Sequence, residues 1–401
     1  MKGRKKSMSK SIYLKGAGIF PSGGRPAIEN GGIFFRNGKI AFVGPAGSFT
    51  PPDGTKIVNA TSKWIIPGLI DAHVHVLMDP DNPNANGRNA NLAPENPYVS
   101  VIRAVEHLKQ YLRAGVTFIR DAGYLNYSNI SLRRCLQAGD IEGPGMLTCG
   151  RTITITGGHA KQWGLIADSP NEVLKAARTL VAAGADVLKV TASDKSDNEY
   201  MLDRDNIATV VRVAHEARKK TMAHASSLVG IKNAVSAGID SVEHATELND
   251  EIIEDMLKKN TFIVPTLTAY SKIEKQNRSS GKKLDHTVGL KRFEKEISSL
   301  MKAYRAGVPI AVGTDAGTVW NYHGASTISE IELLVEAGMK PADVLTSATS
   351  VGARVLGIED SYGTLEVGKH ADFVLLAENP LKRIETLRKP DQVYQAGKRV
   401  A

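Results

Sequence analysis

The sequence predicts an α/β fold in which a (β/α)8 TIM barrel, residues 66–356, carries a small β-sandwich domain built from both termini. In the middle of the chain, short apolar strands alternate with helical patterns, and eight strands can be counted, each followed by helical sequence. Such alternation is typical of a parallel sheet, and eight units over about 280 residues have the size of a closed barrel. At both ends of the chain, strand-like runs follow one another without helices. An open doubly wound sheet is the alternative for the middle region.

The two terminal segments, residues 1–65 and 357–401, are expected to form the β domain together. The strongest local signal is Asn37-Gly38 between two alternating apolar runs, which predicts a β-hairpin. The C-terminal segment has the same texture of short runs rich in β-branched and aromatic residues. The expected strands are residues 11–14, 33–36, 39–43, 363–368, 371–376 and 392–400.

The barrel region begins near residues 64–76, where an apolar run passes through Pro67-Gly68 into an alternating His-Val-His-Val segment. Pairs of alanine and glycine, such as Ala114-Gly115 and Ala183-Gly184, predict helices that stop at a C-terminal glycine before the next strand. The further strands expected are residues 116–121, 145–149, 186–190, 221–225, 240–244, 261–266 and 309–315. The helices expected between them are residues 99–114, 130–138, 170–183, 207–219, 229–237 and 250–258, with another ending near residue 306.

The composition is that of an ordinary globular protein, because 42% of the 401 residues are hydrophobic and 23% are charged. No apolar stretch approaches the roughly 20 residues that cross a bilayer, so no membrane partner is expected. The formal charge of +9 comes from basic residues interleaved with acidic ones, which argues against nucleic-acid binding. Cys135 and Cys149 are the only cysteines, and the basic start at residues 2–10 is a poor secretory signal. We therefore expect a reducing, cytoplasmic location.

The first candidate site residues are His73 and His75, at the end of the first barrel strand. Because side chains alternate along a strand, both imidazoles leave the same face and converge. Two neutral imidazoles at this spacing can bind one metal ion. A surface pair is the ordinary alternative, but the apolar neighbours argue against exposure.

Four further candidates lie at the ends of other strands, at the C-terminal mouth where a barrel carries its chemistry. Taken singly, the lysine would form a salt bridge, the histidines would be satisfied core residues, and the aspartate would cap a helix. Their joint occurrence at strand ends favours a metal site. The four residues are Lys189, His224, His244 and Asp315.

Lys189 indicates that the site holds two metal ions. A lysine ammonium has no lone pair and repels a cation, so a lysine facing a metal must be deprotonated or chemically altered. A neutral amine can add carbon dioxide, and the resulting Lys189 carbamate is long enough to bridge two ions together with a hydroxide. The expected ligands are His73, His75 and Asp315 for one ion and His224 and His244 for the other.

A site of this kind performs hydrolysis. Two divalent ions about 3.5 to 4 Å apart, with zinc the expected metal, lower the pKa of a bridging water and polarise an incoming carbonyl. Asp315, in contact with both water and metal, can accept the water proton and later deliver it to a leaving nitrogen.

Several short motifs accompany these strand-end residues. They are Pro-Gly-Leu-Ile-Asp-Ala-His-Val-His at 67–75, Val-Glu-His at 242–244, Gly-Thr-Asp-Ala-Gly at 313–317, Gly-Thr-Leu at 363–365 and Gly-Lys-His-Ala-Asp at 368–372. With them, the chain resembles the metal-dependent amidohydrolases over nearly its whole length. It is most similar to the branch of binuclear Xaa-Pro dipeptidases and carboxypeptidases acting on N-acyl amino acids and dipeptides, which also contains imidazolonepropionase-like proteins. The features shared with that branch are Ile-Thr-Gly-Gly-His at 155–159 and Asn-Tyr-His-Gly at 321–324.

The resemblance implies roles for two more histidines. His159 is expected to contact the scissile carbonyl or the substrate, since its glycine neighbours let the backbone come close. A loop histidine facing solvent is the alternative. His323 is expected either to line the substrate site or to pack the loop.

Two positions depart from the branch. Ser226 stands where members often carry an aromatic residue or histidine, and Ser193-Asp194 replaces a glycine pair that often follows the strand lysine. Both positions face the substrate in such a barrel. Ser226 would leave space for a bulkier or non-peptide amide, urea or carbamate, whereas Asp194 would favour a cationic group or reject a carboxylate.

The sequence therefore predicts a metal-dependent hydrolase that cleaves an amide-type C–N bond in a small-molecule substrate, with dipeptides or N-acyl amino acids as the first choice. The alternatives are a hydrolase of a non-peptide amide, urea or carbamate, and an imidazolonepropionase-like cyclic-amide hydrolase or mononuclear deaminase, which does not need Lys189 as a ligand. An inactive barrel serving as a binding module would have lost ligands, whereas all six are present. Barrels of this kind are often oligomeric, and a homo-oligomer is compatible with the sequence.

Overall fold

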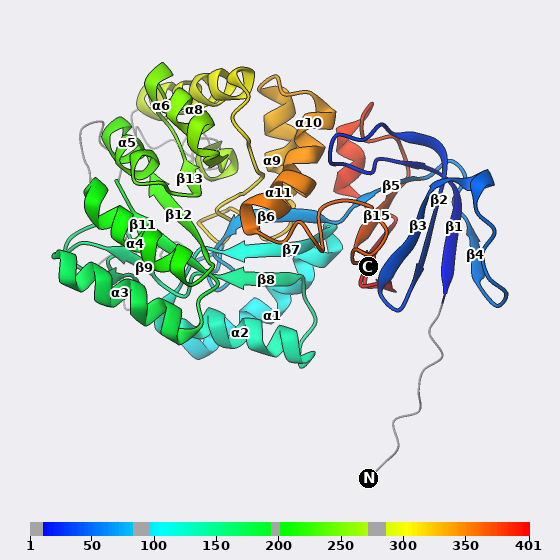
Figure 1. Cartoon of the computed structure of the whole chain (residues 1–401), viewed down its shortest axis with the longest axis horizontal. Coiled ribbons are helices and arrows are strands. Elements are labelled where there is room, and N and C mark those ends of the chain that lie inside the picture. The colour runs from blue at the N-terminus through cyan, green and yellow to red at the C-terminus, as the bar shows by residue number, and fades with distance from the viewer. Residues whose placement is uncertain (1–10, 83–95, 194–200, 272–285) are drawn as a thin grey trace, which may run out of the picture.

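The structure is a computed structural model that describes residues 11–82, 96–193, 201–271 and 286–401. A sheet built from both ends of the chain lies on one side, and a region of parallel strands and helices lies on the other (Figure 1). The mixed α/β class predicted from the sequence is confirmed. Asp194 and the basic start at residues 2–10 lie outside the described residues.

The terminal sheet has eight strands in the order β17-β16-β15-β5-β1-β2-β3, with β4 paired to β1. Strand β5 pairs in parallel with β1 and antiparallel with β15, so it joins the two ends of the chain. The strands are β1 (Ile12–Ile19), β2 (Ile28–Arg36), β3 (Lys39–Pro45), β4 (Lys56–Asn59), β5 (Trp64–Pro67), β15 (Phe373–Leu376), β16 (Gln392–Gln395) and β17 (Lys398–Arg399).

The predicted hairpin is confirmed. Strands β2 and β3 are antiparallel, with Arg36 opposite Lys39. The two residues between them, Asn37 and Gly38, have φ values of 54° and 77°. Positive φ at both central positions is the geometry for which Asn-Gly is preferred in a tight hairpin.

The strand expected at residues 363–368 is wrong. The segment begins at Gly363 and ends at Gly368, whose φ values of 85° and 93° are not those of a strand, and it forms turns and bends instead. Leu365 between them is buried, and its N–H donates to the carbonyl of Pro21. The apolar residue therefore anchors a loop to the N-terminal segment.

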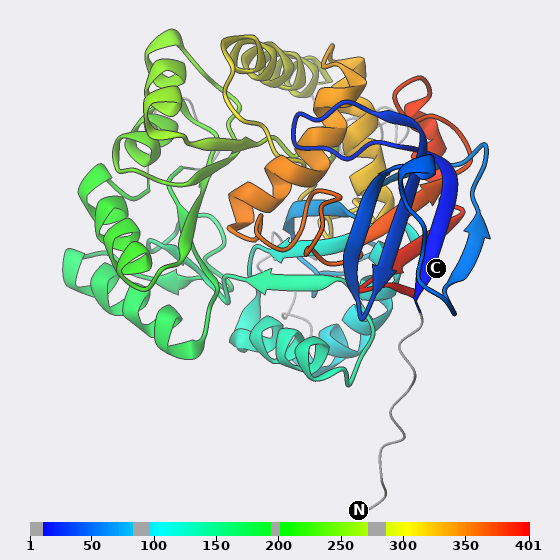
Figure 2. The same cartoon turned by 45° about the vertical axis from the view of Figure 1, so that its right-hand side comes forward.

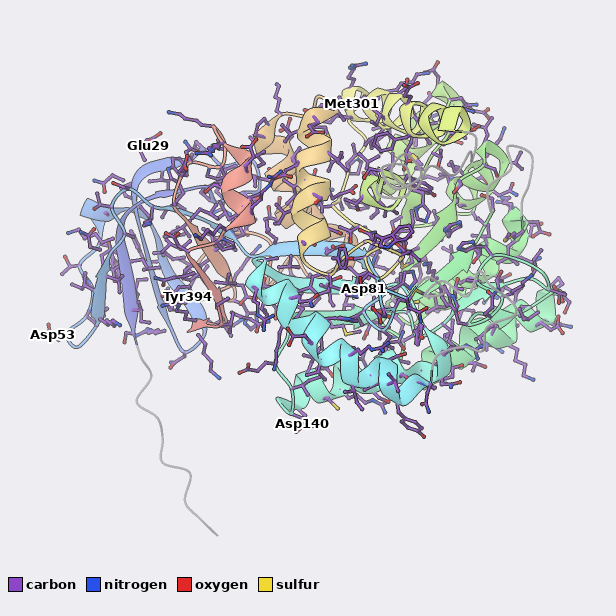
Figure 3. All side chains as sticks on the ribbon, turned by 180° about the vertical axis from the view of Figure 1, so that it is seen from behind. Glu29, Asp53, Asp81, Asp140, Met301 and Tyr394 are labelled. Carbon is purple, nitrogen blue, oxygen red and sulfur yellow. The ribbon has the colours of Figure 1, made fainter. Side chains whose placement is uncertain are left out.

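The core of the terminal sheet is apolar and aromatic. The ring of Phe373 stacks on Tyr394 at a centroid distance of 4.5 Å and contacts Phe35 edge-on at 5.3 Å. Tyr394 is labelled on this sheet in Figure 3. Aliphatic residues such as Leu14 and Ile33 complete the same buried cluster.

The other region contains two parallel sheets, with strand orders β6-β7-β8 and β10-β9-β11-β12-β13-β14. Their strands are almost entirely buried, as expected where helices cover a parallel sheet. The strands are β6 (Leu69–Val74), β7 (Val116–Asp121), β8 (Gly145–Thr148), β9 (Thr152–Thr154), β10 (Leu165–Ile166), β11 (Val187–Thr191), β12 (Lys220–Ala225), β13 (Ser241–His244) and β14 (Phe262–Val264).

The predicted eighth strand, which ends at Asp315, forms single bridges in place of a ladder. Ile310 bridges Ile263 of β14, and Ala316 bridges Val74 of β6, both in parallel. The segment therefore lies between the two parallel sheets and brings Asp315 beside β6.

Helices lie around the parallel strands (Figure 2). The expected helices are confirmed within a few residues, and α3 begins at a capping box on Ser169 and ends at Gly184 in a left-handed conformation. The helices are α1 (Pro97–Arg113), α2 (Ser128–Ala138), α3 (Pro170–Ala183), α4 (Arg204–Glu216), α5 (Leu228–Ser236), α6 (Asp250–Lys259), α8 (His286–Ala306), α9 (Ala325–Glu336), α10 (Pro341–Thr346) and α11 (Gly352–Leu356). Short 3-10 turns occur at Ala46–Ser48, Leu125–Tyr127 and Ile384–Arg388, and a π-type turn at Ser347–Val351 joins α10 to α11.

Within the described parts of the chain, every helix is too short or too polar to span a bilayer. Cys135 and Cys149 are both free thiols.

Candidate active site

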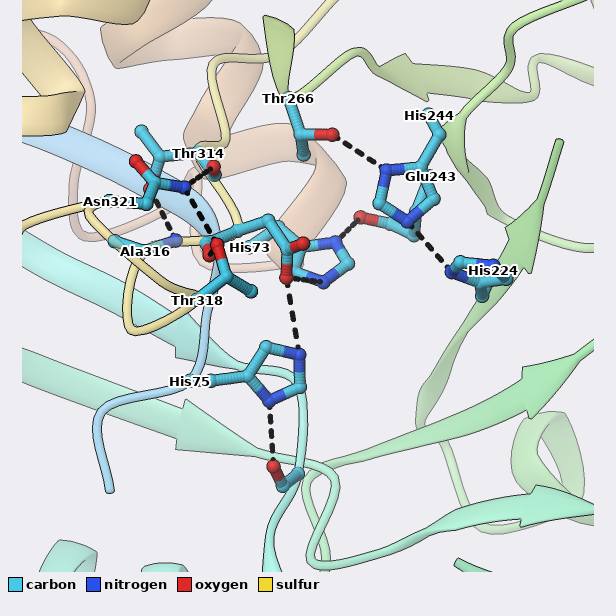
Figure 4. Close-up of polar contacts among 12 residues, drawn as sticks. His73, His75, His224, Glu243, His244, Thr266, Thr314, Ala316, Thr318 and Asn321 are labelled. Carbon is cyan, nitrogen blue, oxygen red and sulfur yellow. Dashed lines mark hydrogen bonds and ion pairs between the residues drawn. The ribbon is translucent and has the colours of Figure 1, made fainter. Parts of the chain in front are cut away.

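The centre of the site is formed by His73 and His75, at the end of β6 (Figure 4), and by Asp315 on the neighbouring segment. Asp315 Oδ1 is 3.5 Å from His73 Nε2 and 3.3 Å from His75 Nε2. One ligand atom from each of the three residues lies within 4.8 Å of the other two. These side chains could therefore hold one metal ion.

Both imidazoles of this pair are oriented through Nδ1. His73 Nδ1 is 2.6 Å from Glu243 Oε2, and His75 Nδ1 is 2.8 Å from the carbonyl oxygen of Gly123. A carboxylate and a carbonyl accept hydrogen bonds, so each Nδ1 donates and each Nε2 keeps its lone pair. Such outer contacts fix the tautomer and the ring orientation of metal-ligating histidines.

Glu243 is a fully buried carboxylate whose role the sequence analysis missed. Its Oε1 accepts hydrogen bonds from Arg120 Nη2 at 2.9 Å and from Ser241 Oγ at 2.6 Å. Arg120 is itself only 1% exposed, and its Nε donates to the carbonyl of Ala72. The two charges therefore tie β7 and β13 to the residue before His73. Charged residues inside strands expected to be buried were the signal that could have identified them.

A second buried carboxylate, Asp71, fixes the backbone beside the site. Its oxygens accept hydrogen bonds from the N–H groups of His73 and Thr314 and from the hydroxyls of Thr314 and Thr327. Burial raises the pKa of Asp71 to about 7, although these hydrogen bonds act in the opposite direction. Because Thr314 precedes Asp315, Asp71 holds β6 against the segment that carries the aspartate of the site.

His224 of β12 and His244 of β13 form a second pair (Figure 4). His224 Nδ1 lies 2.8 Å from His244 Nε2, and His244 Nδ1 lies 2.6 Å from Thr266 Oγ1. His224 Nε2 is buried, and no hydrogen-bond partner for it occurs among the described residues. The ring of His159 stacks on His224 with the centroids 4.1 Å apart. The sequence-predicted pair is thus assembled, with His159 directly against it.

Lys189 lies within β11, between these groups. Its Nζ is 3.4 Å from His73 Nε2 and 5.8 Å from the centroid of the Trp163 ring. The side chain is buried, and no carboxylate in the described parts of the chain forms an ion pair with it. Burial lowers the pKa of Lys189, which is the direction that favours a neutral amine.

Burial also lowers the pKa of four histidines well below its ordinary value, so that their rings are neutral at neutral pH. These are His73, His75, His224 and His244. Neutral imidazoles and a carboxylate form a donor set suited to a divalent ion. With the unpartnered Nε2 of His224, the residues present fit a metal centre.

The backbone is strained at three residues of the site. His244, Thr266 and Asp315 have φ values of 73°, 59° and 57°. A left-handed conformation is uncommon for residues with a side chain, most of all for a β-branched threonine, and such strain concentrates at functional sites. At His244 it also interrupts the strand alternation, so that the adjacent Glu243 and His244 both reach site residues.

His323, expected to line the substrate site or pack the loop, is 2% exposed. Its Nδ1 is 3.0 Å from the hydroxyl of Tyr111, and its Nε2 is 3.0 Å from the carbonyl of Met78. The ring also stacks on His107. Both nitrogens of His323 are thus engaged within the protein, an arrangement that favours loop packing, and its substrate contact stays a prediction.

Ser226 lies directly after β12 and is 5% exposed. Its N–H donates to Ser193 Oγ at 2.9 Å, which connects the ends of β11 and β12. A substrate contact for Ser226 stays a prediction. Asp194 falls outside the described residues, so its expected role is untested.

Comparison with known proteins adds independent observations. The model of the amidohydrolase family matches residues 64–400. Ochratoxinase of Aspergillus niger is 29% identical over 420 residues, which cover 95% of this chain and 84% of that protein. Imidazolonepropionase of Rhizorhabdus wittichii is 26% identical, with 87% of this chain and 88% of that protein covered. A solved structure of a Xaa-Pro dipeptidase with methionine bound in the active site has a TM-score of 0.87 and 26% identity, covering 97% of this chain and 99% of that one.

Proposed function

The chain belongs to the amidohydrolase family, and from this premise we propose that it hydrolyses an amide-type C–N bond in dipeptides or N-acyl amino acids. The observation that carries the proposal is the chain of contacts from Asp315 through His73 to Lys189, next to the His224–His244 pair. Residues separated by more than 200 positions along the sequence meet there. They bring together the donor types that metal-assisted hydrolysis requires.

The proposed cofactors are two divalent metal ions, with zinc as the expected metal. The neutral histidines, the unpartnered His224 Nε2 and the buried Lys189 without an ion pair support this assignment. When bound, the ions would acidify a water molecule and polarise the substrate carbonyl. The proposed ligands are His73, His75 and Asp315 for one ion and His224 and His244 for the other, with a carbamate on Lys189 between them.

Asp315 is the proposed general base and acid. Its side chain is 18% exposed, whereas His73 and His75 beside it are nearly inaccessible, so Asp315 is the member of the trio that a substrate can approach. A carboxylate in this position accepts a proton from the attacking water and returns it to the leaving nitrogen. Hydrogen bonds around Asp71 hold the preceding residue, Thr314, and thereby keep the carboxylate in place.

His159 is proposed to contact the scissile carbonyl or another part of the substrate. Its ring stacks on His224, and its carbonyl accepts a hydrogen bond from Thr154 Oγ1 that fixes the loop. Gly157, two residues before it, has open space where a side chain would stand, so a substrate can approach the backbone there.

The relatives support an amide substrate that releases an amino acid. One is a Xaa-Pro dipeptidase by name, with methionine bound in its active site, and another is an ochratoxinase. By the same resemblance, the small Ser226 would leave space for a bulkier amide substrate. A non-peptide amide, urea or carbamate is the alternative substrate class on the same ground.

Metal analysis followed by a substrate screen tests the proposal. We expect two metal ions per chain, loss of activity on chelation, and turnover within a panel of N-acyl amino acids, Xaa-Pro dipeptides, aryl ureas and carbamates. His244→Gln should lose one ion, whereas His215→Gln, at an exposed histidine paired with Asp240, should keep both. Metal-replete protein that cleaves no C–N bond in the panel would contradict the proposal.

A mononuclear cyclic-amide hydrolase or deaminase is the second candidate. The imidazolonepropionase relative and the compact trio of His73, His75 and Asp315 favour it. Metal stoichiometry of Lys189→Ala separates the two candidates. The binuclear enzyme should lose one or both ions, whereas a mononuclear enzyme should keep full occupancy.

The scaffold proposed for this site is a (β/α)8 barrel of residues 66–356, with a small β-sandwich from residues 1–65 and 357–401. The parallel pairing within the two sheets β6-β7-β8 and β10-β9-β11-β12-β13-β14 supports it. The segment with Ile310 and Ala316 also bridges one strand of each sheet. We further propose a cytoplasmic enzyme acting on small molecules, without nucleic-acid or membrane partners, because both cysteines are free and no basic segment dominates the sequence. A homo-oligomer is compatible with this proposal.

A further inference from the structure

The chemistry proposed above makes no use of Glu330, a glutamate on α9 with no exposed surface. Its Oε1 accepts a hydrogen bond from the N–H of Leu267 at 2.8 Å, and its Oε2 accepts one from the N–H of Thr268 at 2.7 Å. Burial raises the pKa of Glu330 to about 8, and no cation of the described residues pairs with it. A buried carboxylate without a counter-ion is unfavourable, so its retention calls for a reason beyond packing.

The two N–H groups belong to the turn that follows β14. Thr266, directly before them, has a φ of 59°, a conformation that a β-branched residue adopts only when its surroundings enforce it. Capturing the next two N–H groups with both oxygens of one carboxylate is such a constraint. Glu330 therefore holds Thr266 in its strained conformation.

The strained conformation places Thr266 against the site. Thr266 Oγ1 lies 2.6 Å from His244 Nδ1, and the other ring nitrogen of His244 lies 2.8 Å from His224 (Figure 4). A hydroxyl can both donate and accept, so this contact fixes the direction in which the ring faces rather than the nitrogen that carries the proton. The hydroxyl of Thr266 thus contacts Nδ1 of His244, as the carboxylate of Glu243 contacts Nδ1 of His73.

The same turn also reaches the other half of the site. Thr268 Oγ1 donates to the carbonyl of Thr314 at 3.1 Å, one residue before Asp315. Three residues before Glu330 on α9, Thr327 donates to Asp71. One face of α9 therefore supports both groups of site residues from behind.

We propose that Glu330 is a positioning residue that fixes the turn at residues 266–268, so that Thr266 sets the orientation of the His244 ring. This inference rests on the proposed function, since it gives His244 a role at the metal centre. Glutamine cannot replace Glu330 in this role, because its amide offers one acceptor and turns an N–H donor toward a backbone N–H.

The test uses the full-length protein freed of metal and labelled with ¹⁵N-histidine. The ring nitrogens of His244 are observed by NMR and assigned by their loss in His244→Gln. In Glu330→Gln, these signals should move away from their wild-type positions. Thr266→Ala should move them in the same way, and the double variant should add little, because both changes break one pathway. Glu336→Gln, at an exposed glutamate of the same helix, is the matched control and should leave them unchanged.

A chelator competition gives a second measurement that does not depend on activity. Glu330→Gln should weaken binding of one of two ions by about 10- to 100-fold and leave the other unchanged. If Glu330→Gln does not fold, Glu330→Asp, which keeps the carboxyl group but shortens the side chain, should displace the His244 signals less far in the same direction. His244 signals of wild-type position in a folded Glu330 variant overturn the inference. A wild-type protein that binds no second ion, but whose His244 signals respond to Glu330→Gln, contradicts the binuclear function and leaves the positioning role intact.

Discussion

The terminal sheet and the candidate site bury side chains of opposite kinds. In the sheet, Phe35, Phe373 and Tyr394 pack among aliphatic residues, and their burial is favourable wherever the rings fit. In the site, Glu243 and Lys189 are equally buried, yet charge and polarity make their burial unfavourable unless each has a suitable partner. The sheet therefore stabilises the fold, whereas the site depends on that stability to hold its groups in place.

The backbone shows the same contrast. Left-handed residues of the sheet, such as Asn37, lie at hairpin turns, where the conformation is ordinary. In the site, His244, Thr266 and Asp315 adopt it while fully or largely buried. A substitution in the sheet should therefore change the free energy of unfolding, and one in the site should change chemistry.

Asp315→Asn should give the largest loss of activity with the smallest change in stability. Asparagine tolerates a positive φ, so the fold at φ 57° is kept, while the proton acceptor and the negative charge are lost. We expect kcat/KM to fall by about 10²- to 10⁴-fold, with the melting temperature of metal-free protein nearly unchanged. Steady-state kinetics and calorimetry on the same sample measure both. Asp205→Asn, at an exposed aspartate, is the control, and a comparable activity in both variants would remove Asp315 from the mechanism.

Phe373→Ala should produce the reverse pattern. The ring has no exposed surface and contacts two aromatic neighbours, so its removal should lower the free energy of unfolding by about 3–5 kcal/mol. The kcat/KM of the folded fraction should not change, since none of the site residues described above belongs to this cluster. Urea denaturation followed by activity per folded molecule tests this. Val367→Ala, at an exposed valine of the C-terminal segment, should change neither the free energy of unfolding nor kcat/KM. A large loss of activity in folded Phe373→Ala would show that the two regions are coupled.

Asp372→Asn tests the comparison through the pH dependence of stability, because Asp372 is a buried acid at the terminal sheet. Burial raises its pKa from 3.8 to about 6, while hydrogen bonds from Ala396 and Thr117 oppose the shift. Between these pH values the unfolded chain has lost a proton that the folded protein keeps. This contribution to stability is therefore complete below pH 3.8 and is lost as pH rises through about 6.

Asp372→Asn has no carboxyl group at this position, so it does not lose this stability as the pH rises. From pH 4 to 7, the free energy of unfolding of Asp372→Asn should rise relative to wild type by on the order of 2–3 kcal/mol, as measured by urea denaturation at each pH. Asp53→Asn, at an exposed aspartate, serves as the control. A difference between Asp372→Asn and wild type that stays constant with pH would refute the assignment.

Much of this architecture was predictable from the sequence because it depends on short-range patterns. The Asn37-Gly38 hairpin and the helix ending at Gly184 follow from the conformations that those residues prefer. The alternation at His73 and His75 and the rule that chemistry lies at strand ends indicated the residues that the structure brings together. These inferences need only the type and period of each element.

The rest depends on contacts between distant elements, which no local pattern encodes. Strand alternation places Glu243 and His244 on opposite faces, and only the left-handed φ at His244 brings both to the site. Glu330 lies on a helix after the last parallel strand, β14, and its partners are backbone N–H groups more than 60 positions earlier. Buried carboxylates of this kind look like surface residues in a sequence. Their roles appear only when the register of the packed elements is known.

Glu243→Gln should break the simple division between the two regions, because Glu243 is part of a buried charge pair and also orients His73. Its two oxygens accept from Arg120, Ser241 and His73, whereas glutamine offers a single acceptor and must direct its N–H₂ at one of these donors. We expect activity or metal affinity to fall about 10- to 100-fold and the free energy of unfolding to fall as well, since Arg120 keeps its charge without a carboxylate. Paired measurements of chelator competition and urea denaturation, with exposed Glu251→Gln as control, test both effects. A change in metal affinity without any loss of stability would indicate that the strands alone support Arg120, and that Glu243 serves only the site.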